Sequence, residues 1–415
     1  MEKITASIIT IGDELLIGQT IDTNSAWMAQ QLNNMGIWVQ RRVAVGDTRQ
    51  AIVEALDAES ATADIILITG GLGPTADDIT KPTLTAYFGG KLVSHEPTLQ
   101  RLMKFFESRG LPVLQRNVDQ ALVPDVCTVL FNNWGLAPGM WFEKDGKVYV
   151  SMPGVPHEMK GIMEHHVLPR LQEQFPTKAV IHQTLLTSGL GESFIAERLL
   201  NFEANLPPYI KLAYLPSYGL LKLRLTALGE DKVSTAAELK LHFQEMQTLL
   251  ADITVAEEDI PMGEVLGRIL RAGNKTVGTA ESCTGGYIAH NITAIPGSSA
   301  YFKGSVVTYS NEMKMKLLAV KEETLAAHGA VSEETVREMA AGALQLLETD
   351  YAIAVSGIMG PDGGSPEKPV GTVWIAVASA ANIVTVKHRM IYDRERNIHM
   401  TAIYAMNELR KLLNA

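Results

Sequence analysis

The chain has 415 residues, 46% of them hydrophobic and 20% charged, which is ordinary for a globular protein long enough to form two or three cores. Its formal net charge of -10 leaves no excess of positive charge for non-specific binding to nucleic acid. The two cysteines, Cys127 and Cys283, argue against a disulfide framework and against a cysteine zinc site. Because neither a signal-peptide pattern nor an apolar run of membrane-spanning length occurs, we expect a cytoplasmic protein.

The first part of the chain alternates strand and helix patterns. A helix from about Thr23 to Met35 is closed by Gly36, a residue type that commonly follows the last helical turn. Asp47 is expected to cap the next helix. Apolar or β-branched runs that read as strands lie at 7–11, 37–45 and 65–69. This β-α-β-α-β order predicts an α/β domain over residues 1–175, with a parallel, doubly wound sheet.

Glycine-rich turns with carboxylates follow two of these strands. Gly12 precedes Asp13 and Glu14, and the run 69–80 reads TGGLGPTADDIT. In parallel α/β sheets such turns meet in a crevice beyond the strand ends. Loop amides there can hold phosphate, and carboxylates can hold a divalent cation against phosphate oxygens. Two aspartates before a helix can also simply cap it.

Residues 176–255 show a different pattern of strands and helices, which predicts a small α+β unit. Strand patterns lie at 178–187, 211–215 and 221–227, and helix patterns lie at 192–200 and 233–250. The unit is similar to a KH-type module, but it lacks the basic GxxG loop that clamps a nucleic-acid backbone. We therefore predict a spacer or dimerisation domain here, and a homodimer, without direct binding to nucleic acid.

A serine-containing turn marks the last predicted domain, residues 260–415. The run 280–286, AESCTGG, lies between the strand-like 276–279 and a helix pattern. Backbone N–H groups and a serine hydroxyl at a helix start can bind an anion or stabilise a developing oxyanion. An isolated serine before a helix is more often only its cap. The turn nevertheless makes an enzyme our leading hypothesis.

Several segments together resemble a known family. The turn around Ser282 occurs with PGSSA, TYSN, HGAVS and SGIMGP at 296–300, 308–311, 328–332 and 356–361. This set resembles the nicotinamide mononucleotide (NMN) deamidases. The whole chain is similar to the CinA (competence/damage-inducible) family, in which the deamidase is the C-terminal domain and a molybdopterin-binding-like domain precedes it.

The resemblance implies a serine/lysine pair for hydrolysis of an amide. Ser282 is the candidate nucleophile and Lys314 our choice of base, with Lys303 and Lys316 as alternatives. A lysine acts as a base only if burial or nearby positive charge lowers its pKa. Cys283 is a further candidate nucleophile, although no histidine-and-amide arrangement points to it. No cofactor is expected for this site.

Other residues of the last domain are candidates for proton relay and substrate binding. Ser299 and Tyr309 are the predicted catalytic helpers. The predicted substrate-binding residues are the turn residues Thr284, Gly285 and Gly286, the loop residues Gly357, Gly360 and Pro361, and the phosphate-binding candidates Lys368, Arg394 and Arg396.

The N-terminal motifs resemble the CinA branch of the molybdopterin-binding fold. This branch is associated with metal-dependent hydrolysis of ADP-ribose to AMP and ribose 5-phosphate. The resemblance implies a divalent metal (Mg²⁺, Co²⁺ or Mn²⁺), and a requirement for K⁺ stays open. Asp77, Asp78 and Asp13 are the predicted ligands, with Glu14 or His157 as helpers. The expected substrate-binding residues are Gly12, Asn24, Gly70, Gly71 and Gly154.

Taken together, the sequence predicts a bifunctional hydrolase acting on NMN and ADP-ribose. One alternative keeps the deamidase but gives the N-terminal domain only a pterin- or nucleotide-binding role. A second alternative is an interaction protein serving DNA uptake or recombination. No Nudix box is present, so the ADP-ribose activity rests on the resemblance.

Overall fold

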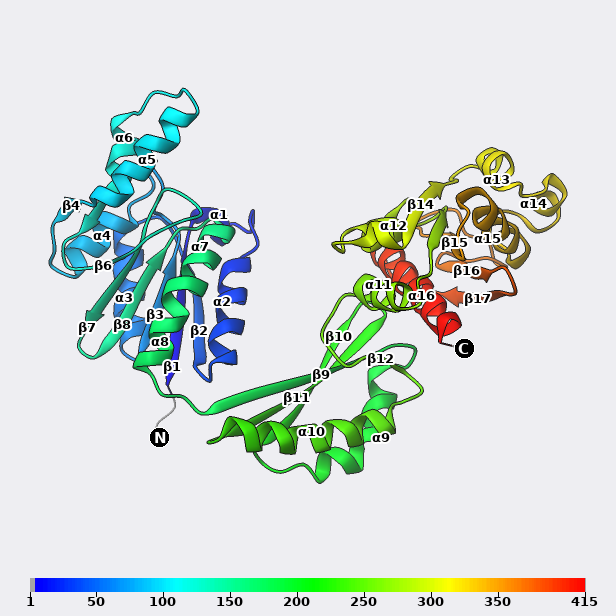
Figure 1. The fold of residues 1–415 in the computed structure, drawn as a ribbon, viewed down its shortest axis with the longest axis horizontal. Helices are drawn as coiled ribbons and strands as arrows, with labels where there is room; N and C mark the ends of the chain where they lie inside the picture. The colour runs from blue at the N-terminus through cyan, green and yellow to red at the C-terminus, as the bar shows by residue number, and fades with distance from the viewer. Residues whose placement is uncertain (1–3, 415) are drawn as a thin grey trace. The chain divides into compact units, whose positions relative to one another are not determined.

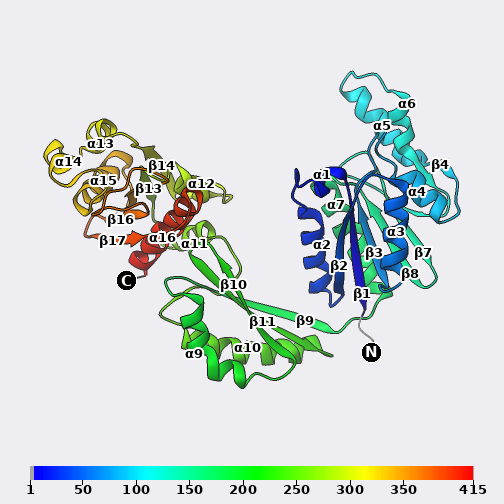
Figure 2. The ribbon, with the colours of Figure 1, turned by 180° about the vertical axis from the view of Figure 1, so that it is seen from behind.

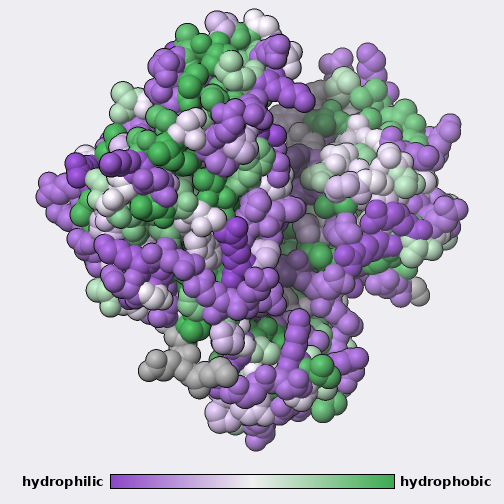
Figure 3. All heavy atoms as spheres, turned by 60° about the vertical axis from the view of Figure 1, so that its left-hand side comes forward, coloured by the Kyte–Doolittle hydropathy of each residue, from purple (hydrophilic) through white to green (hydrophobic). Residues whose placement is uncertain are grey.

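The computed structural model describes residues 4–414 and divides into two compact units. The first unit contains the chain up to Ile181 together with Ala227–Ala236. The second contains His182–Thr226 and Ala237–Ala415. None of the helices in the described residues is long and apolar enough to cross a membrane. On the face in Figure 3, hydrophilic side chains separate smaller hydrophobic areas.

A six-stranded sheet in the order β2-β1-β3-β8-β7-β6 forms the centre of the first unit. Its strands are β1 (Thr5–Ile11), β2 (Trp38–Val45), β3 (Ile65–Thr69), β6 (Thr128–Leu130), β7 (Gly139–Lys144) and β8 (Lys147–Met152). The first four in the order are parallel, whereas β7 pairs antiparallel with β8 and β6 with β7. The predicted parallel sheet is thus mixed. Asp145 and Gly146 both have positive φ and form the two-residue turn that joins β7 to β8 as a hairpin.

Helices cover both faces of this sheet, as predicted for a doubly wound domain. Alternate residues of β1 face opposite sides: Ile8 packs among α2, α7 and α8, and Ile9 among α3 and α4. Figure 1 shows α7 and α8 in front of the sheet, and Figure 2 shows α3 on the other face. The helices are α1 (Asp13–Leu16), α2 (Thr23–Asn34), α3 (Arg49–Ser60), α4 (Thr80–Tyr87), α7 (Pro156–Ile162), the π-helical η2 (Met163–Val167) and α8 (Leu168–Gln174).

Two predictions about helix ends have different outcomes. Gly36 has φ 81° just after α2, so the predicted end of this helix is confirmed. The predicted cap of α3 is wrong, because Thr48 and not Asp47 accepts the hydrogen bond from the N–H of Ala51. The Asp47 carboxylate instead accepts a hydrogen bond from the N–H of Asp13 at 2.9 Å.

A small lobe adds to the first unit at the end of the sheet where β1, β3 and β8 finish (Figure 1). It contains β4 (Leu92–Ser94), α5 (Glu96–Ser108), α6 (Gln115–Val118), η1 (Asp119–Ala121) and β5 (Leu122–Pro124). β4 and β5 pair antiparallel. Because the lobe stands at the strand ends, it supplies one wall of the cavity described below.

The middle of the chain, which lies mostly in the second unit, forms a four-stranded sheet in the order β10-β11-β9-β12. Its elements are β9 (Ala179–Thr187), α9 (Glu192–Ala204), β10 (Ile210–Ser217), β11 (Leu220–Gly229), α10 (Lys232–Leu249) and β12 (Thr254–Ala256). The predicted order of strands and helices in the middle of the chain is confirmed. Leu186 and Val255 of this sheet share one hydrophobic core with the C-terminal layers, and Leu220 packs against it.

A five-stranded sheet, β14-β13-β15-β16-β17, forms the centre of the C-terminal part. β14, β13 and β15 are parallel, and β16 and β17 continue antiparallel. Helices α11, α12 and α16 pack on one face, and α15 packs on an alanine-rich stripe of the other. The elements are α11 (Met262–Ala272), β13 (Val277–Glu281), α12 (Tyr287–Thr293), η3 (Ser298–Ala300), β14 (Phe302–Val307), α13 (Asn311–Leu318), α14 (Glu322–His328), α15 (Glu333–Leu347), β15 (Tyr351–Gly357), β16 (Thr372–Ser379), β17 (Ile383–Arg389) and α16 (Arg394–Leu413).

Two candidate active sites

Ser282 lies directly after β13, in the turn that leads to α12. Its N–H donates to the carbonyl of Val355 at 3.1 Å, which continues the pairing of β13 with β15. Gly285 and Gly286 have φ 60° and 101°, and these left-handed conformations turn the chain into the helix. Ser282 is therefore placed at the carboxyl edge of a rigid parallel sheet.

Lys314, from the first turns of α13, reaches Ser282. Its Nζ donates to Ser282 Oγ at 3.0 Å, to the Thr308 carbonyl at 2.8 Å and to the Tyr309 carbonyl at 3.4 Å. The side chain is only 1% exposed. The two alternative bases, Lys303 and Lys316, are both exposed. The structure thus brings together the predicted nucleophile and the predicted base.

The environment of this pair shifts Lys314 toward its neutral form. Burial lowers the pKa of Lys314, and no carboxylate of the described chain forms an ion pair with it. A neutral amine has two N–H bonds and one lone pair. The two carbonyls can take the N–H bonds, which directs the lone pair to the Ser282 hydroxyl.

Cys283 is a poor nucleophile in this environment. Its side chain is buried, and burial raises its pKa to about 12, with a smaller contribution from the charge of Glu281. A thiol with this pKa stays protonated at neutral pH, and the thiolate is the reactive form. The geometry therefore favours Ser282 over Cys283.

Glu281 is a site residue that the sequence analysis missed. Its carboxylate is fully buried and accepts hydrogen bonds from the N–H groups of Gly286 (3.0 Å), Ile288 (3.0 Å) and Ala289 (2.8 Å). The Thr284 hydroxyl also donates to it, at 2.6 Å. The first amides of α12 are thus occupied, and Gly286 is not available as the predicted anion donor. The sequence signal that could have predicted this role is a glutamate directly before Ser282 and three residues before Thr284.

The remaining donors near Ser282 are amides of the turn itself. The N–H of Gly285 donates back to the Ser282 carbonyl at 3.2 Å. For the N–H groups of Cys283 and Thr284, no acceptor is found within residues 4–414. These two amides are therefore the ones that can stabilise negative charge beside Ser282.

The loop after β15 is held next to the site by α16. Arg394 donates to the Gly360 carbonyl at 2.8 Å and to the Tyr309 hydroxyl at 3.1 Å. Asn397, fully buried, donates to the Met359 carbonyl at 3.1 Å. The Gly360–Pro361 peptide bond is cis. A Cβ at Gly357 would lie 3.2 Å from Cys283 Sγ, so this glycine permits close packing of the loop on the serine turn.

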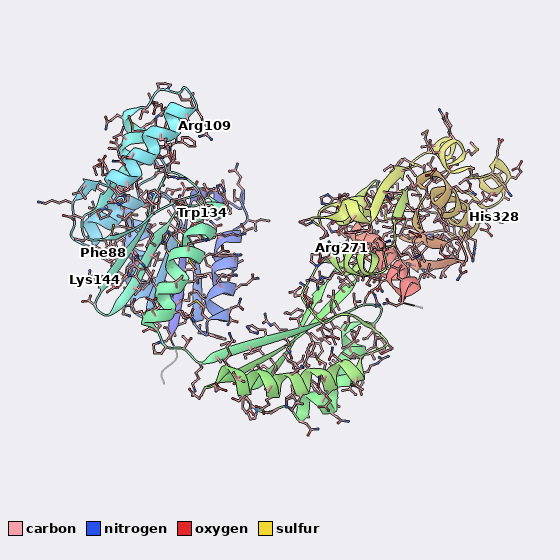
Figure 4. The ribbon with its side chains drawn as sticks, viewed as in Figure 1. Phe88, Arg109, Trp134, Lys144, Arg271 and His328 are labelled. Atoms are coloured by element: carbon pink, nitrogen blue, oxygen red, sulfur yellow. The ribbon has the colours of Figure 1, made fainter. Side chains whose placement is uncertain are left out.

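Three predicted residues are not gathered around Ser282. Ser299 lies in η3 before β14, and the register Val277↔Phe302 places it at the opposite end of the sheet. Lys368 donates to the carbonyl of His328 at 2.5 Å, and His328, labelled in Figure 4, is the last residue of α14. The Arg396 guanidinium lies 5.8 Å from the ring centroid of Tyr218 and 5.6 Å from that of Tyr392. Residues two apart on a helix point to different sides, which separates Arg396 from Arg394.

In the first unit, a cavity of about 580 Å³ opens at the carboxyl ends of the strands. Glycine-rich turns form its floor and aromatic side chains part of its walls. Trp134, labelled in Figure 4, packs on Gly161 of α7. The lining includes Gly12, Glu14, Asp47, Gly70, Gly71, Gly73, Asp77, Asp78, Phe105, Gln120, Trp134, Gly154 and Glu158.

The glycine-rich loop after β3 is fastened by Asp78. Its carboxylate accepts from the N–H of Gly73 at 2.7 Å and from the N–H and hydroxyl of Thr75 at 2.8 and 2.5 Å. A Cβ at Gly70 would lie 2.2 Å from the Ile11 carbonyl, which explains why glycine occupies this position. Within the described residues no acceptor is found for the N–H groups of Gly71 and Leu72, which leaves them for a ligand.

The carboxylates around the cavity differ in what they contact. Asp13 and Asp47 exchange hydrogen bonds between backbone N–H and carboxylate at 2.9 and 3.2 Å, and Asp47 lines the cavity whereas Asp13 does not. Burial raises the pKa of Asp47, and the charges of Asp13, Glu14 and Asp77 raise it further. Asp77 is exposed, and hydrogen bonding from Thr75 lowers its pKa.

These residues suit a divalent metal ion only if it keeps most of its water ligands and uses one or two carboxylates. Within the described chain, no group of three or more His, Cys, Asp or Glu side chains is arranged to hold an ion. Mg²⁺ usually keeps several waters and uses one or two carboxylates together with substrate phosphates. Asp77 and Asp47, which line the cavity and form no ion pair within the described residues, suit that kind of binding. The predicted trio of Asp13, Asp77 and Asp78 is not assembled as a ligand set.

The other predicted residues of this domain fall on and beside the cavity. Asn24 donates to the Gly154 carbonyl at 2.7 Å, while its own Oδ1 is buried without a partner. His157 is exposed and does not line the cavity, whereas the next residue, Glu158, does. Glu158 accepts from Asn132 at 2.6 Å. Among the carboxylates that line the cavity, Glu158 and Asp47 are the two that the sequence analysis did not assign to the site.

Three family models match successive parts of the chain. They are the probable molybdopterin binding domain over residues 7–173, the damage-inducible protein CinA KH domain over residues 182–253, and the CinA C-terminal domain over residues 259–413. These matches confirm the predicted fold class, with mixed sheets in the N-terminal and C-terminal domains.

Relatives extend this likeness over the whole chain. A CinA-like protein of Cytophaga hutchinsonii is 45% identical, covering 99% of this chain and 98% of the relative. A CinA-like protein of Flavobacterium psychrophilum is 44% identical, covering 98% of each. The crystal structure of the competence damage-inducible protein A from Klebsiella pneumoniae is 40% identical, with TM-score 0.36, and covers 37% of this chain and 95% of that one. By its full-length relatives and its three domain matches, the chain belongs to the CinA family.

Proposed function

We propose that the C-terminal domain hydrolyses the carboxamide of NMN to nicotinate mononucleotide and ammonia. The observation that carries the proposal is the buried contact of 3.0 Å between Lys314 Nζ and Ser282 Oγ, without a carboxylate partner for the lysine. A nucleophile hydrogen-bonded to a base of lowered pKa is the arrangement that acyl transfer requires.

The proposed reaction proceeds in two halves. Neutral Lys314 accepts the Ser282 proton as Oγ attacks the carboxamide carbon, and the amides of Cys283 and Thr284 stabilise the oxyanion. Lys314 then gives this proton to the departing nitrogen as the C–N bond breaks. Ammonia leaves, and the acyl group remains on Ser282 as an ester. Water, deprotonated by Lys314, cleaves the ester and restores the serine.

Substrate binding is assigned to the loop that α16 holds beside the serine turn. Arg394 is exposed and has N–H groups beyond the two that contact Gly360 and Tyr309. An arginine there suits the 5′-phosphate of a mononucleotide. Glu281 holds the start of α12 and thereby keeps the serine turn in place, so we assign it a positioning role.

The first test is release of ammonia from NMN by the full chain in the presence of EDTA. We expect turnover in EDTA, and a loss of about 10²–10⁴-fold in kcat when Lys314 is replaced by Met or Ala. Ser282→Ala is expected to abolish turnover, while Lys316→Ala, an exposed lysine of the same helix, serves as the matched control. Full activity of Ser282→Ala would overturn the assignment.

We propose a second activity for the N-terminal domain, the hydrolysis of ADP-ribose to AMP and ribose 5-phosphate. The cavity favours it, because a glycine-rich floor with free amides, unpaired carboxylates and aromatic walls suits a nucleoside diphosphate. A bound divalent ion would neutralise diphosphate charge and lower the pKa of water, with Asp77 and Asp47 as its holders. The amides of Gly71 and Leu72 would hold phosphate oxygens, and Trp134 and Phe105 would border the base.

Two aspartate variants separate catalysis from loop structure. Asp77→Asn is expected to lower release of AMP at least about 10²-fold without changing thermal stability, because Asp77 is exposed. Asp78→Ala is expected to lower both the release of AMP and the thermal stability, because the N–H groups of Gly73 and Thr75 lose their acceptor. If the unmodified protein binds ADP-ribose but releases no AMP with any divalent ion, the domain only binds nucleotides.

A further inference from the structure

Another cavity lies in the second unit, separate from the Ser282 site. It has a volume of about 500 Å³ and lies between the β10–β11 hairpin and the start of α16. Figures 1 and 2 show the hairpin reaching this helix. None of the residues that line this cavity is among those that surround Ser282. The lining residues are Pro216, Ser217, Tyr218, Gly219, Tyr392, Arg396 and Met400. We call it the hairpin cavity.

The hairpin cavity has a chemically specific lining. The guanidinium of Arg396 lies within 6 Å of the rings of both Tyr218 and Tyr392. No ion pair or side-chain hydrogen bond to Arg396 is found within residues 4–414, and the nearby Asp393 is engaged as the cap of α16. The two tyrosines are 44% and 43% exposed. Exposed aromatic faces around an unpaired arginine suit a ligand with a flat ring and an anionic group.

The walls of the hairpin cavity are fixed in place. Ser188 donates to the Gly219 carbonyl at 2.9 Å, and a Cβ at Gly219 would lie 3.1 Å from the ring of Tyr404. Tyr218 meets His399 edge-on at 5.2 Å between ring centroids. The hairpin is thus packed on α16, and the cavity is a preformed feature of the unit.

Two short chains of contacts connect the hairpin cavity with the deamidase site. In the first, Tyr218 contacts His399, which stacks on Tyr287 at 4.5 Å, the first residue of α12 after the serine turn. In the second, Asn397 donates to the Tyr392 carbonyl at 2.9 Å and to the Met359 carbonyl of the substrate loop at 3.1 Å. A ligand that contacts Tyr218 and Tyr392 therefore meets the first residue of each chain of contacts, and each chain ends at a segment that forms the Ser282 site.

We propose that the hairpin cavity binds a nucleoside monophosphate, with the base against Tyr218 and Tyr392 and the phosphate on Arg396, and that this ligand modulates turnover at Ser282. The ring and the phosphate are both required, because the cavity offers stacking faces and one unpaired cation. The modulation rests on the proposed deamidase function, whereas the binding does not.

Hydrogen exchange of the full chain with and without AMP tests the binding. We expect saturating AMP to slow exchange of the amides in 214–220 and 391–400 at least about fivefold, and adenosine or inorganic phosphate alone to have a smaller effect. Peptides of the N-terminal cavity report any binding there separately. No change in 214–220 and 391–400 would overturn the proposal, and so would equal protection by phosphate alone.

Matched tyrosine variants locate the effect. Tyr218→Ala is expected to abolish protection of 391–400, whereas Tyr209→Ala is expected to keep it. Tyr209 is 41% exposed in the same domain but contacts Glu238 and does not line the cavity. Retained protection in Tyr218→Ala, with a melting temperature equal to that of Tyr209→Ala, would contradict the site.

Turnover of NMN tests the modulation. We expect AMP to change the KM for NMN about fivefold or more in the unmodified protein and not in Tyr218→Ala. If AMP binds but leaves KM and kcat unchanged, the modulation is wrong while the binding site stands. If the protein does not turn over NMN at all, the proposed function fails and the exchange experiment still decides the site.

Discussion

At the scale of single residues, Lys314 carries most of the proposed chemistry. Burial lowers its pKa, and its partners are the Ser282 hydroxyl and two main-chain carbonyls. The sequence could predict the candidate because Lys314 follows the end of a strand beside the serine turn. It could not predict the burial, which depends on how α13 packs against the sheet.

The pH dependence of kcat follows from this pKa. Lys314 must be neutral to accept the Ser282 proton, so kcat rises with pH through the folded-state pKa of the lysine and is constant above it. Since burial lowers that pKa, the rise lies below the range of an ordinary lysine. Measuring kcat against pH in the unmodified protein checks this. A rise centred at an ordinary lysine pKa would contradict the role of burial.

Replacing Cys283 tests which neighbour attacks. Because the pKa of Cys283 is raised to about 12, its thiol is protonated and unreactive at neutral pH. We expect Cys283→Ala to keep kcat within about twofold and to lose about 1 kcal/mol of stability from packing against Gly357. Ammonia release and thermal unfolding measure the two effects. A loss of turnover equal to that of Ser282→Ala would point to the thiol.

At the scale of elements, the start of α12 depends on one internal carboxylate. Glu281 takes three backbone N–H groups of the turn and first helical residues, so the helix start is not an anion site. Sequence patterns could place the strand, the turn and the helix. They could not show that a strand residue folds back to occupy the helix end, because this depends on the left-handed Gly285 and Gly286.

Glu281→Gln is the corresponding prediction. The amide nitrogen of glutamine would face backbone donors, which leaves at least one buried N–H without an acceptor. We expect a loss of about 1–3 kcal/mol in the free energy of unfolding, together with a lower kcat. Thermal denaturation and ammonia release measure both, with the exposed Glu312→Gln as control. Unchanged stability would mean that the carboxylate does not hold the helix start.

At the scale of the whole molecule, the two proposed sites use different means to handle charge. The C-terminal site surrounds a buried amine with main-chain carbonyls, and the N-terminal cavity gathers several carboxylates. The sequence predicted both glycine-rich turns, because their motifs are local. It could not show that Ser299 and Arg396 lie apart from Ser282. The direction of β14 decides at which end of the sheet Ser299 lies, and the helical spacing of α16 decides which side of the helix Arg396 occupies.

Chelation is expected to separate the two activities. EDTA should abolish release of AMP from ADP-ribose and leave release of ammonia from NMN unchanged within error. Adding back Mg²⁺, Mn²⁺ or Co²⁺ one at a time should restore the release of AMP and should not change the release of ammonia. Both reactions are measured on one sample by chromatography of the nucleotides. Loss of both in EDTA would contradict a metal-independent serine/lysine site.

The contacts of Lys314 also bear on how this site can evolve. The groups that hold the amine are the carbonyls of Thr308 and Tyr309, which every amino acid would supply at those positions. Substitutions there can alter the neighbouring side chains without removing the hold on the base. The position of the proposed proton acceptor therefore depends on the path of the backbone, and side chains of the surrounding loops can change without removing these two contacts.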